Sequence, residues 1–278
     1  MASKFIDAKT ILKSDDYIFD LTLDVTFKRV FLEDNNIKFL EYLVSNVTNY
    51  KDIKDLTIKN TEIPNSKSVN VKSSFSDLIL GKDSKEYIIE MNGSYSNLLY
   101  YKNNYYVIKE HSRRCNRSNT YGIDEYTTLI NIDNYNIKEE LKINKGEVGL
   151  IYRVNKIFDN EYYSDVYKNI EIYNINLDYL RKKYYNDDKL NEFEKFLIIF
   201  IEQDKNKILS ICNNELVREL IEYMDTLKYE ENFIATYDRE AFENAEKQEL
   251  EDTKREIENS KKELEENQKE LEENQKEL

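Results

Sequence analysis

The alternation of apolar and polar residues is clearest in the first third of the chain, where two short apolar runs flank a polar stretch. The runs cover residues 75–80 and 86–91, and residues 81–85 between them are rich in turn-forming and charged types. This pattern is typical of two strands joined by a hairpin loop. Residues of one parity share a face of a strand, so Asp77 and Glu90 are expected to converge on one side of a small sheet.

Apolar residues at spacings of three and four predict helices before this hairpin. Residues 17–50 carry the pattern, and the polar residues 34–36 divide it into two helices and can cap the second. Residues 51–63 predict a short strand, and residues 64–66 predict a turn that leads into the hairpin. We therefore expect the order helix, helix, strand and strand hairpin.

A long helix is predicted after the hairpin, over residues 94–117, with four apolar residues on one face. These are Leu98, Tyr101, Tyr105 and Ile108, at spacings of three and four. We expect this stripe to pack against the sheet. The alternative for its tyrosines is stacking on nucleic-acid bases.

Further strands and then a run of helices are predicted after the long helix. The strands cover residues 129–132, 148–154 and 170–175, and the helices cover residues 177–184, 192–202, 205–213 and 215–228. These elements divide the chain into a core of residues 1–175, a helical section of residues 176–241 and a charged helical tail of residues 242–278.

The tail contains an identical seven-residue repeat, residues 262–268 and 269–275, and its apolar residues fall seven apart from Leu250 onward. A coiled coil needs a second apolar position in each heptad, and here that position is polar. Two interpretations stay open. One is a solvated single helix supported by ion pairs four residues apart, and the other is a weak coiled coil that joins copies of the chain into a homo-oligomer.

Composition indicates one medium-sized globular domain with an extension. The 278 residues are 40% hydrophobic and 13% aromatic. The two cysteines, Cys115 and Cys212, match no metal-binding spacing and suit a reducing compartment. The N-terminus has no apolar signal core, and the apolar run of residues 196–201 is too short to cross a bilayer. We therefore expect a cytoplasmic protein without a membrane partner.

The net charge of −14 argues against binding nucleic acid by charge alone. Residues 246–278 contain 13 acidic and 7 basic side chains, so the remainder of the chain keeps a net charge of −8. A metal-dependent nuclease with a local basic patch stays compatible with this balance.

Asp77 and Glu90 form the candidate chemical centre. An acidic pair on a hairpin is common and is compatible with a purely solvated role. Glu90, however, lies in an apolar run, where a carboxylate is costly unless it is paired or binds a metal. Asn92 lies two residues further and points to the same face. Two carboxylates beside an amide are a typical way for a sheet to hold a divalent metal for phosphodiester hydrolysis.

Asp77, followed after the hairpin by Glu90-Met91-Asn92, resembles the signature of PD-(D/E)XK nucleases. The ordered set of flanking motifs is similar to that of the Rpn family of recombination-promoting nucleases, also described as PD-(D/E)XK family transposases. These motifs are Asp24-Val25-Thr26-Phe27-Lys28-Arg29-Val30-Phe31 before the hairpin, and the tyrosine-rich helix, Gly122 and Ile130-Asn131-Ile132-Asp133 after it. The resemblance extends over about residues 20–175.

The resemblance implies a chemistry and the residues that perform it. Asp77, Glu90 and the backbone carbonyl of Met91 would bind Mg²⁺, with Mn²⁺ as the alternative, and the metal would activate a water and polarise the scissile phosphate. Asn92 would position that water, where this family has Gln and most related nucleases have Lys. Asn is one methylene shorter than Gln and lacks the charge of Lys. Asp24 would be an outer metal ligand, and its alternatives are a helix N-cap or a solvated side chain.

Four basic residues are candidates for DNA contacts: Lys28 on the first long helix, and Arg113, Arg114 and Arg117 at the end of the tyrosine-rich helix. The alternative for Lys28 is a solvated helix charge. The alternative for the arginines is a set of cations that complement the helix dipole. His111 is the only histidine, so a histidine-based metal site is excluded.

Taken together, the patterns predict an α/β protein, and the resemblance implies that its core is of the PD-(D/E)XK, restriction-endonuclease-like type. A mixed central sheet is flanked by helices, and a helical section and the charged helix follow. By the resemblance, the protein is a Mg²⁺-dependent DNA endonuclease, a hydrolase that acts in recombination, mobile-element transfer or defence. The alternative is a nuclease-like module that binds DNA or a protein without cleavage, with the tail as an assembly element.

Overall fold

The computed structural model describes residues 6–51, 53–59, 62–63, 74–96, 98–115, 124–137, 148–152 and 169–276. Some of the predicted features lie outside these described residues: the turn at residues 64–66, Arg117, Gly122 and the end of the strand at residues 153–154.

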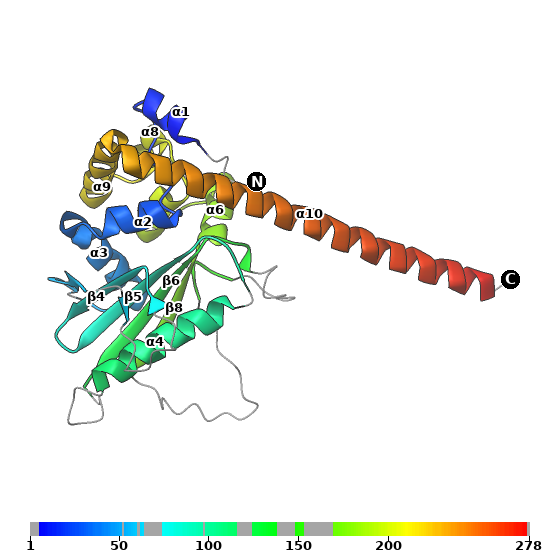
Figure 1. The fold of residues 1–278 in the computed structure, drawn as a ribbon, viewed down its shortest axis with the longest axis horizontal. Helices are drawn as coiled ribbons and strands as arrows, with labels where there is room; N and C mark the ends of the chain where they lie inside the picture. The colour runs from blue at the N-terminus through cyan, green and yellow to red at the C-terminus, as the bar shows by residue number, and fades with distance from the viewer. Residues whose placement is uncertain are drawn as a thin grey trace.

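Within the described residues, six strands form one mixed sheet in the order β1-β4-β5-β6-β8-β7 (Figure 1). The strands are β1 (Thr57–Ile58), β4 (Leu78–Lys82), β5 (Lys85–Asn92), β6 (Tyr126–Asp133), β7 (Ile151–Tyr152) and β8 (Ile170–Asn176). Strands β1, β4 and β5 are antiparallel neighbours, β5, β6 and β8 run parallel, and β7 is antiparallel to β8. Two short strands, β2 (Glu62–Ile63) and β3 (Ser74–Phe75), form a separate pair. The predicted mixed α/β architecture is confirmed.

The turn of the β4–β5 hairpin is shorter than the predicted loop of residues 81–85. The strands continue through Lys82 and resume at Lys85, so the turn consists of Asp83 and Ser84. Asp83 has a φ of 52°, a left-handed conformation that Asp tolerates and that two-residue hairpin turns require. The polar composition indicated the turn but not its length, because charged residues can also continue an exposed strand end.

Helices cover both faces of this sheet (Figure 1). They are α1 (Ala8–Lys13), α2 (Asp24–Phe31), η1 (Asp34–Asn36), α3 (Ile37–Thr48), α4 (Leu99–Cys115), α6 (Leu177–Tyr185), α7 (Glu192–Leu197), η2 (Ile198–Phe200), α8 (Lys205–Ile211), α9 (Glu215–Thr226), η3 (Leu227–Tyr229) and α10 (Glu231–Lys276). Helix α4 lies along one face, and α2, α3 and the C-terminal helices lie on the other. The predicted helices are present, and α1 is an addition to them.

The two faces of β5 contribute to two separate cores. Tyr87 and Ile89 point into the larger core, which they share with the helices of the N-terminal and C-terminal parts of the chain. Ile88 points to the other face, where it packs with Leu129 of β6 and Val107 of α4. Burial on both faces explains the nearly continuous apolar run of β5. After the exposed Lys85, a charged side chain on this strand therefore has little access to bulk water.

The predicted orientation of α4 is wrong. The stripe of Leu98, Tyr101, Tyr105 and Ile108, which was expected to pack on the sheet, is exposed. The buried side of α4 consists of Leu99, Asn103, Val107, Glu110 and Arg114. Three of these residues are polar or charged, and two of them, Asn103 and Arg114, have partners on distant strands. Apolar periodicity therefore indicated the opposite face.

Helix α10 begins in the core and continues outward as a single helix (Figure 1). Phe233, Tyr237 and Ala241 are buried, whereas Phe242 and Leu250 are exposed. The predicted boundary at residue 242 therefore falls inside one helix, at the point where its burial ends. None of the described helices, α10 included, has the length and apolarity needed to span a membrane.

The first turns of α10 are expected to stabilise the fold, and the later turns are not. Tyr237→Ala is expected to lower the free energy of unfolding by about 3–5 kcal/mol, because it removes a fully buried ring that packs against Phe19 at 4.9 Å between centroids. The matched change Leu250→Ala, on the same helix, is expected to alter it by less than about 0.5 kcal/mol. Urea denaturation measures both values, and equal losses would contradict this assignment.

Candidate active site

The hairpin brings Asp77 and Glu90 to adjacent positions at one end of the sheet. Asp77 immediately precedes β4, and Glu90 lies near the end of β5. The antiparallel register pairs Leu78 with Ile89, so one further step sets Asp77 opposite Glu90. Both side chains are buried, and Glu90 has no exposed surface. The two carboxylates thus lie side by side, as the hairpin pattern indicates.

Each carboxylate is anchored by a backbone N–H group. The Asp77 N–H donates to Glu90 Oε1 at 3.1 Å, and the Met91 N–H donates to Asp77 Oδ2 at 2.8 Å. Each acid keeps its second oxygen, Asp77 Oδ1 or Glu90 Oε2, for another partner. The carbonyl of a strand residue points to the same side as its N–H, so the Met91 carbonyl is expected at the edge of β5 that faces β4.

Lysines from the two helical layers reach the second oxygens. Lys28 Nζ, from α2, lies 3.1 Å from Asp77 Oδ1, and Lys102 Nζ, from α4, lies 3.1 Å from Glu90 Oε2. Glu90 Oε2 is buried and makes no hydrogen bond of good geometry within the described structure, so the ammonium of Lys102 is its compensation. Lys28 was predicted to contact DNA, and the structure places it against the carboxylates.

Lys102 is a site residue that the sequence patterns do not single out. The chain is rich in lysine, and Lys102 follows Asn92 by ten residues, on a helix whose buried face was predicted incorrectly. The available signal was indirect. Because Asn92 leaves the signature without its positive charge, a lysine on the next helix was a candidate replacement.

Burial sets the protonation of the acidic pair. Burial and the adjacent charge of Asp77 raise the pKa of Glu90 to about 7, against the opposing effect of Lys102. Burial also raises the pKa of Asp77, although Lys28 acts to lower it. Two adjacent carboxylates are costly to ionise in a buried site. The pair therefore requires either a proton or additional positive charge.

The Asn92 side chain is hydrogen-bonded to the neighbouring strand, and its role in positioning a water stays a prediction. Its side-chain amide donates to Asp133 Oδ1 on the neighbouring strand β6, at 2.8 Å. The parallel register pairs these two residues, and Tyr152 donates to the other oxygen of Asp133 at 2.6 Å. A buried carboxylate needs such donors. The Asn92 amide is thus hydrogen-bonded to Asp133. The positive charge beside Glu90 comes from Lys102 instead.

A row of buried amides continues from Glu90 across the sheet. The parallel registers align Glu90 with Asn131 of β6 and Asn174 of β8. Asn131 donates to Asn174 at 2.8 Å and accepts from Asn103 of α4 at 2.7 Å. Buried polar groups are normally hydrogen-bonded, and these bonds tie α4 to the sheet. The row therefore fixes the helix that carries Lys102.

Asp24 is linked to the pair through Lys28. It is the first residue of α2, with Leu23 at the N-cap position, and its side chain is half exposed. Lys28 Nζ lies 2.7 Å from Asp24 Oδ1 and 3.1 Å from Asp77 Oδ1. Asp24 is therefore not the N-cap. It orients Lys28, and its role as an outer metal ligand stays a prediction.

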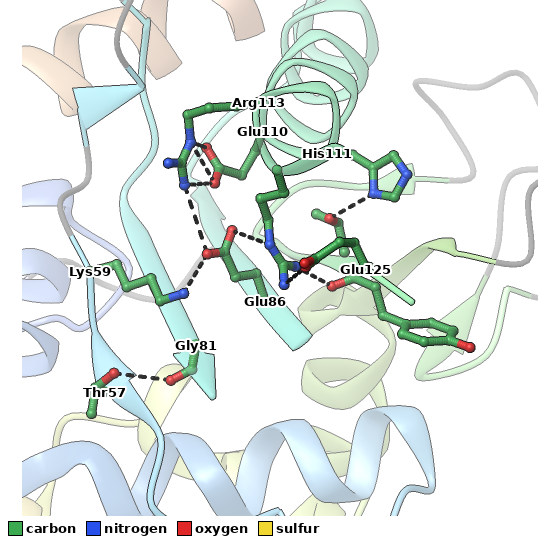
Figure 2. A network of polar contacts seen from close by, with 11 residues as sticks. Thr57, Lys59, Gly81, Glu86, Glu110, His111, Arg113 and Glu125 are labelled. Atoms are coloured by element: carbon green, nitrogen blue, oxygen red, sulfur yellow. Dashed lines mark hydrogen bonds and ion pairs between the residues drawn. The ribbon is translucent and has the colours of Figure 1, made fainter. Parts of the chain in front are cut away.

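Arg113 and Arg114 belong to a network of charges around Glu86, at the opposite end of β5. Figure 2 shows this network, with Arg113 beside Glu86 and Glu110. Arg113 Nε donates to Glu110 at 2.8 Å, and Arg114 Nε lies 3.6 Å from Glu86. Lys59 completes the network, 2.5 Å from the other oxygen of Glu86. These arginines already compensate buried carboxylates. Their contact with phosphate stays a prediction that this geometry does not favour.

A cavity of about 1170 Å³ opens between α10, α6 and the end of β5, and it is lined by neighbours of the acidic pair but not by Asp77 or Glu90 themselves. Asp24, Met91 and Lys102 line it on the side of the acidic pair. Arg181 of α6 also lines it, donates to Asn134, and has its pKa lowered by burial. The buried Arg181 Nε has no hydrogen-bond partner in the described structure. Asp20 and Asp178 already act on the charge of Arg181, so an anionic ligand for this guanidinium stays a prediction.

Comparison with known proteins does not assign the chain to a family. No family model, curated protein or solved structure matches it. A mixed α/β fold supports many activities, so the evidence for function has to come from the site.

The raised pKa of Glu90 is expected to make stability depend on pH. Between pH 4.5, the ordinary value, and about pH 7, the folded state binds more protons than the unfolded state, so the free energy of unfolding falls as pH rises. Glu90→Gln removes this titration. Without metal, the free energy of unfolding of the wild-type protein is expected to fall by about 2–3 kcal/mol more than that of Glu90→Gln between pH 4 and pH 8.

Urea denaturation at a series of pH values measures this difference. The matched control is Glu222→Gln, an exposed acid on α9, which is expected to follow the wild-type curve. Parallel curves for Glu90→Gln and the wild type would contradict the assigned titration.

Proposed function

We propose that the protein is a metal-dependent DNA endonuclease of the PD-(D/E)XK type, similar in its site to the Rpn nucleases. The observation that carries this proposal is the Asp77–Glu90 pair, in which each acid is fixed by a backbone N–H and has its second oxygen beside a lysine. The element order α3, β1, β4–β5 hairpin, α4 and β6 supports it, because this is the order expected from the resemblance.

The donor set at this pair suits Mg²⁺ or Mn²⁺. Asp77 and Glu90 would supply carboxylate oxygens, and Met91 would supply its backbone carbonyl. No group of three or more acidic, His or Cys side chains is placed to hold a metal within the described residues. Mg²⁺ is nevertheless commonly bound through one or two carboxylates and keeps several waters.

The state of Glu90 also favours a cation. Its Oε2 atom is buried without a hydrogen bond of good geometry within the described structure, and its pKa is raised to about 7 beside Asp77. Additional positive charge would remove the cost of ionising both acids. When bound, the metal would supply a more acidic water and polarise the scissile phosphate.

Lys102 would supply the positive charge that Asn92 lacks. Its ammonium contacts Glu90 and lines the cavity, so it can donate to a phosphate oxygen as negative charge develops there. Lys28 favours the ionised form of Asp77. Arg181, in the same cavity, would hold a neighbouring phosphate. These three cations give an acidic chain a local site for a polyanion.

One observation favours a second candidate, a nuclease-like module that binds DNA or a protein without cleavage. Lys28 and Lys102 already compensate the second oxygens of Asp77 and Glu90. A site that is neutralised by its own lysines is stable without a metal. Such a module would bind its partner in the presence or absence of Mg²⁺ and would leave the phosphodiester intact.

Plasmid cleavage separates these two functions. Purified protein with Mg²⁺ or Mn²⁺ is expected to convert supercoiled plasmid into nicked and linear DNA. Asp77→Asn, Glu90→Gln and Lys102→Met are each expected to slow cleavage by about 100-fold or more, because each removes a group that holds charge in the transition state. Asn92→Ala is expected to slow it less than tenfold, since its amide bonds Asp133.

The matched control is Glu86→Gln, the same change at a buried acid on the same face of β5, which pairs with Lys59 away from the site. It is expected to cleave at the wild-type rate. Cleavage that is equal in all variants, or absent from the wild-type protein, would exclude the endonuclease.

Assembly through the tail is a separate proposal. Leu250, Ile257 and Leu264 lie seven residues apart on α10 and are exposed, so they form a row that a second copy could cover. Light scattering is expected to show a concentration-dependent oligomer that deletion of residues 246–278 converts to a monomer. If the deletion leaves the number of chains in the particle unchanged, the tail does not assemble copies of the chain and is a solvated single helix.

A further inference from the structure

The outward face of α4 carries an apolar stripe that the described fold leaves uncovered. Leu98, Tyr101, Tyr105 and Ile108 are 72%, 75%, 45% and 59% exposed, respectively. We call these four residues the tyrosine face. Solvent-exposed apolar side chains that form one continuous patch commonly mark a site of interaction.

A basic row runs along one flank of the tyrosine face. Lys102 and Lys109 are seven residues apart, so they lie on nearly the same line of the helix. Lys109 Nζ lies 5.5 Å from the centre of the Tyr105 ring, and Lys102 Nζ lies 5.4 Å from that of Tyr106. Helix α4 as a whole contains four Lys or Arg residues and one Glu, in a chain of net charge −14.

The basic row connects this face with the candidate active site. Lys102 belongs to both, since the same ammonium lies 3.1 Å from Glu90 Oε2. Tyr105 follows it by one helical turn. A ligand that covers the tyrosine face and contacts Lys102 would therefore reach the acidic pair.

We propose that the tyrosine face binds a nucleic-acid strand with unpaired bases and delivers it to the candidate active site. The bases stack on Tyr101 and Tyr105, which are about 6 Å apart along the helix axis at a rise of 1.5 Å per residue. Lys102 and Lys109 contact the phosphates. Aromatic rings beside a row of cations are the usual means of binding single strands. This inference rests on the proposed function, whose substrate it specifies as single-stranded or locally unpaired.

Charge favours a nucleic acid over a second copy of the chain on this face. Two copies joined through their tyrosine faces would bring Lys102 and Lys109 of one copy toward those of the other, which is unfavourable. A phosphate backbone matches the same row. The bases of a duplex are already stacked on one another, so they leave no free face for Tyr101 and Tyr105.

The test measures binding of a fluorescent 20-nucleotide oligothymidylate to the full chain by anisotropy, without divalent metal. Tyr101→Ala with Tyr105→Ala is expected to weaken binding about 100-fold, about tenfold for each ring. Tyr101→Phe with Tyr105→Phe is expected to retain it, because stacking needs the ring and not the hydroxyl. Binding of the corresponding duplex is expected to be unchanged by either pair of changes.

The matched control is Tyr229→Ala, which removes a tyrosine that is 89% exposed on η3 and is expected to leave binding unchanged. Lys109→Gln is expected to lower the slope of log affinity against log salt by about 0.7. Circular dichroism melting confirms that each variant is folded, as the exposure of the altered side chains leads us to expect.

Equal affinity of the double alanine variant and the wild-type protein for oligothymidylate would overturn the inference. So would a dimer of the wild-type protein, seen by light scattering, that the double alanine change abolishes while strand binding persists, because the face would then bind protein. Since no metal or cleavage enters this assay, a failure of the proposed endonuclease would appear only in the plasmid assay and would remain distinguishable.

Discussion

Two carboxylates buried side by side are the constraint on which the rest of this structure depends. Asp77 and Glu90 can occupy neighbouring strands only because each receives a backbone N–H across the hairpin and an ammonium from a helix. Lys28 comes from the layer on one face of the sheet and Lys102 from the layer on the other. Both helical layers must therefore pack on the sheet for the two carboxylates to be compensated. Removing either lysine would leave a buried charge without a partner.

The same constraint explains why the polar part of the sheet lies beside α4. Glu90, Asn131 and Asn174 are aligned across three strands. Asn131 is hydrogen-bonded to Asn174 on the next strand and to Asn103 of the helix. Apolar packing alone does not fix how far a helix slides along a sheet, whereas directed hydrogen bonds do. These hydrogen bonds thus fix the position of α4 along the sheet, and with it the position of the Lys102 ammonium at the acidic pair.

Local patterns predicted the hairpin and the convergence of Asp77 and Glu90, because strand periodicity and turn composition act over a few residues. The face of α4 was predicted incorrectly, because its buried Asn103 and Glu110 look like solvent-facing residues until their distant partners are known. The partner of Asn92 depends on the register of β5 with β6, which are separated by a helix in the sequence. Lys102 was missed for the same reason, since its contact with Glu90 exists only when the helix is docked.

The central proposal is that the acidic pair of Asp77 and Glu90 holds a divalent cation. Anomalous diffraction from crystals soaked in Mn²⁺ tests this claim most directly, because it locates the ion independently of any activity. We predict a peak within bonding distance, about 2.2 Å, of carboxylate oxygens of both Asp77 and Glu90, with Lys102 displaced from Glu90 Oε2. The proposal would be contradicted if saturating Mn²⁺ gave no peak at this pair and both lysines still contacted the carboxylates.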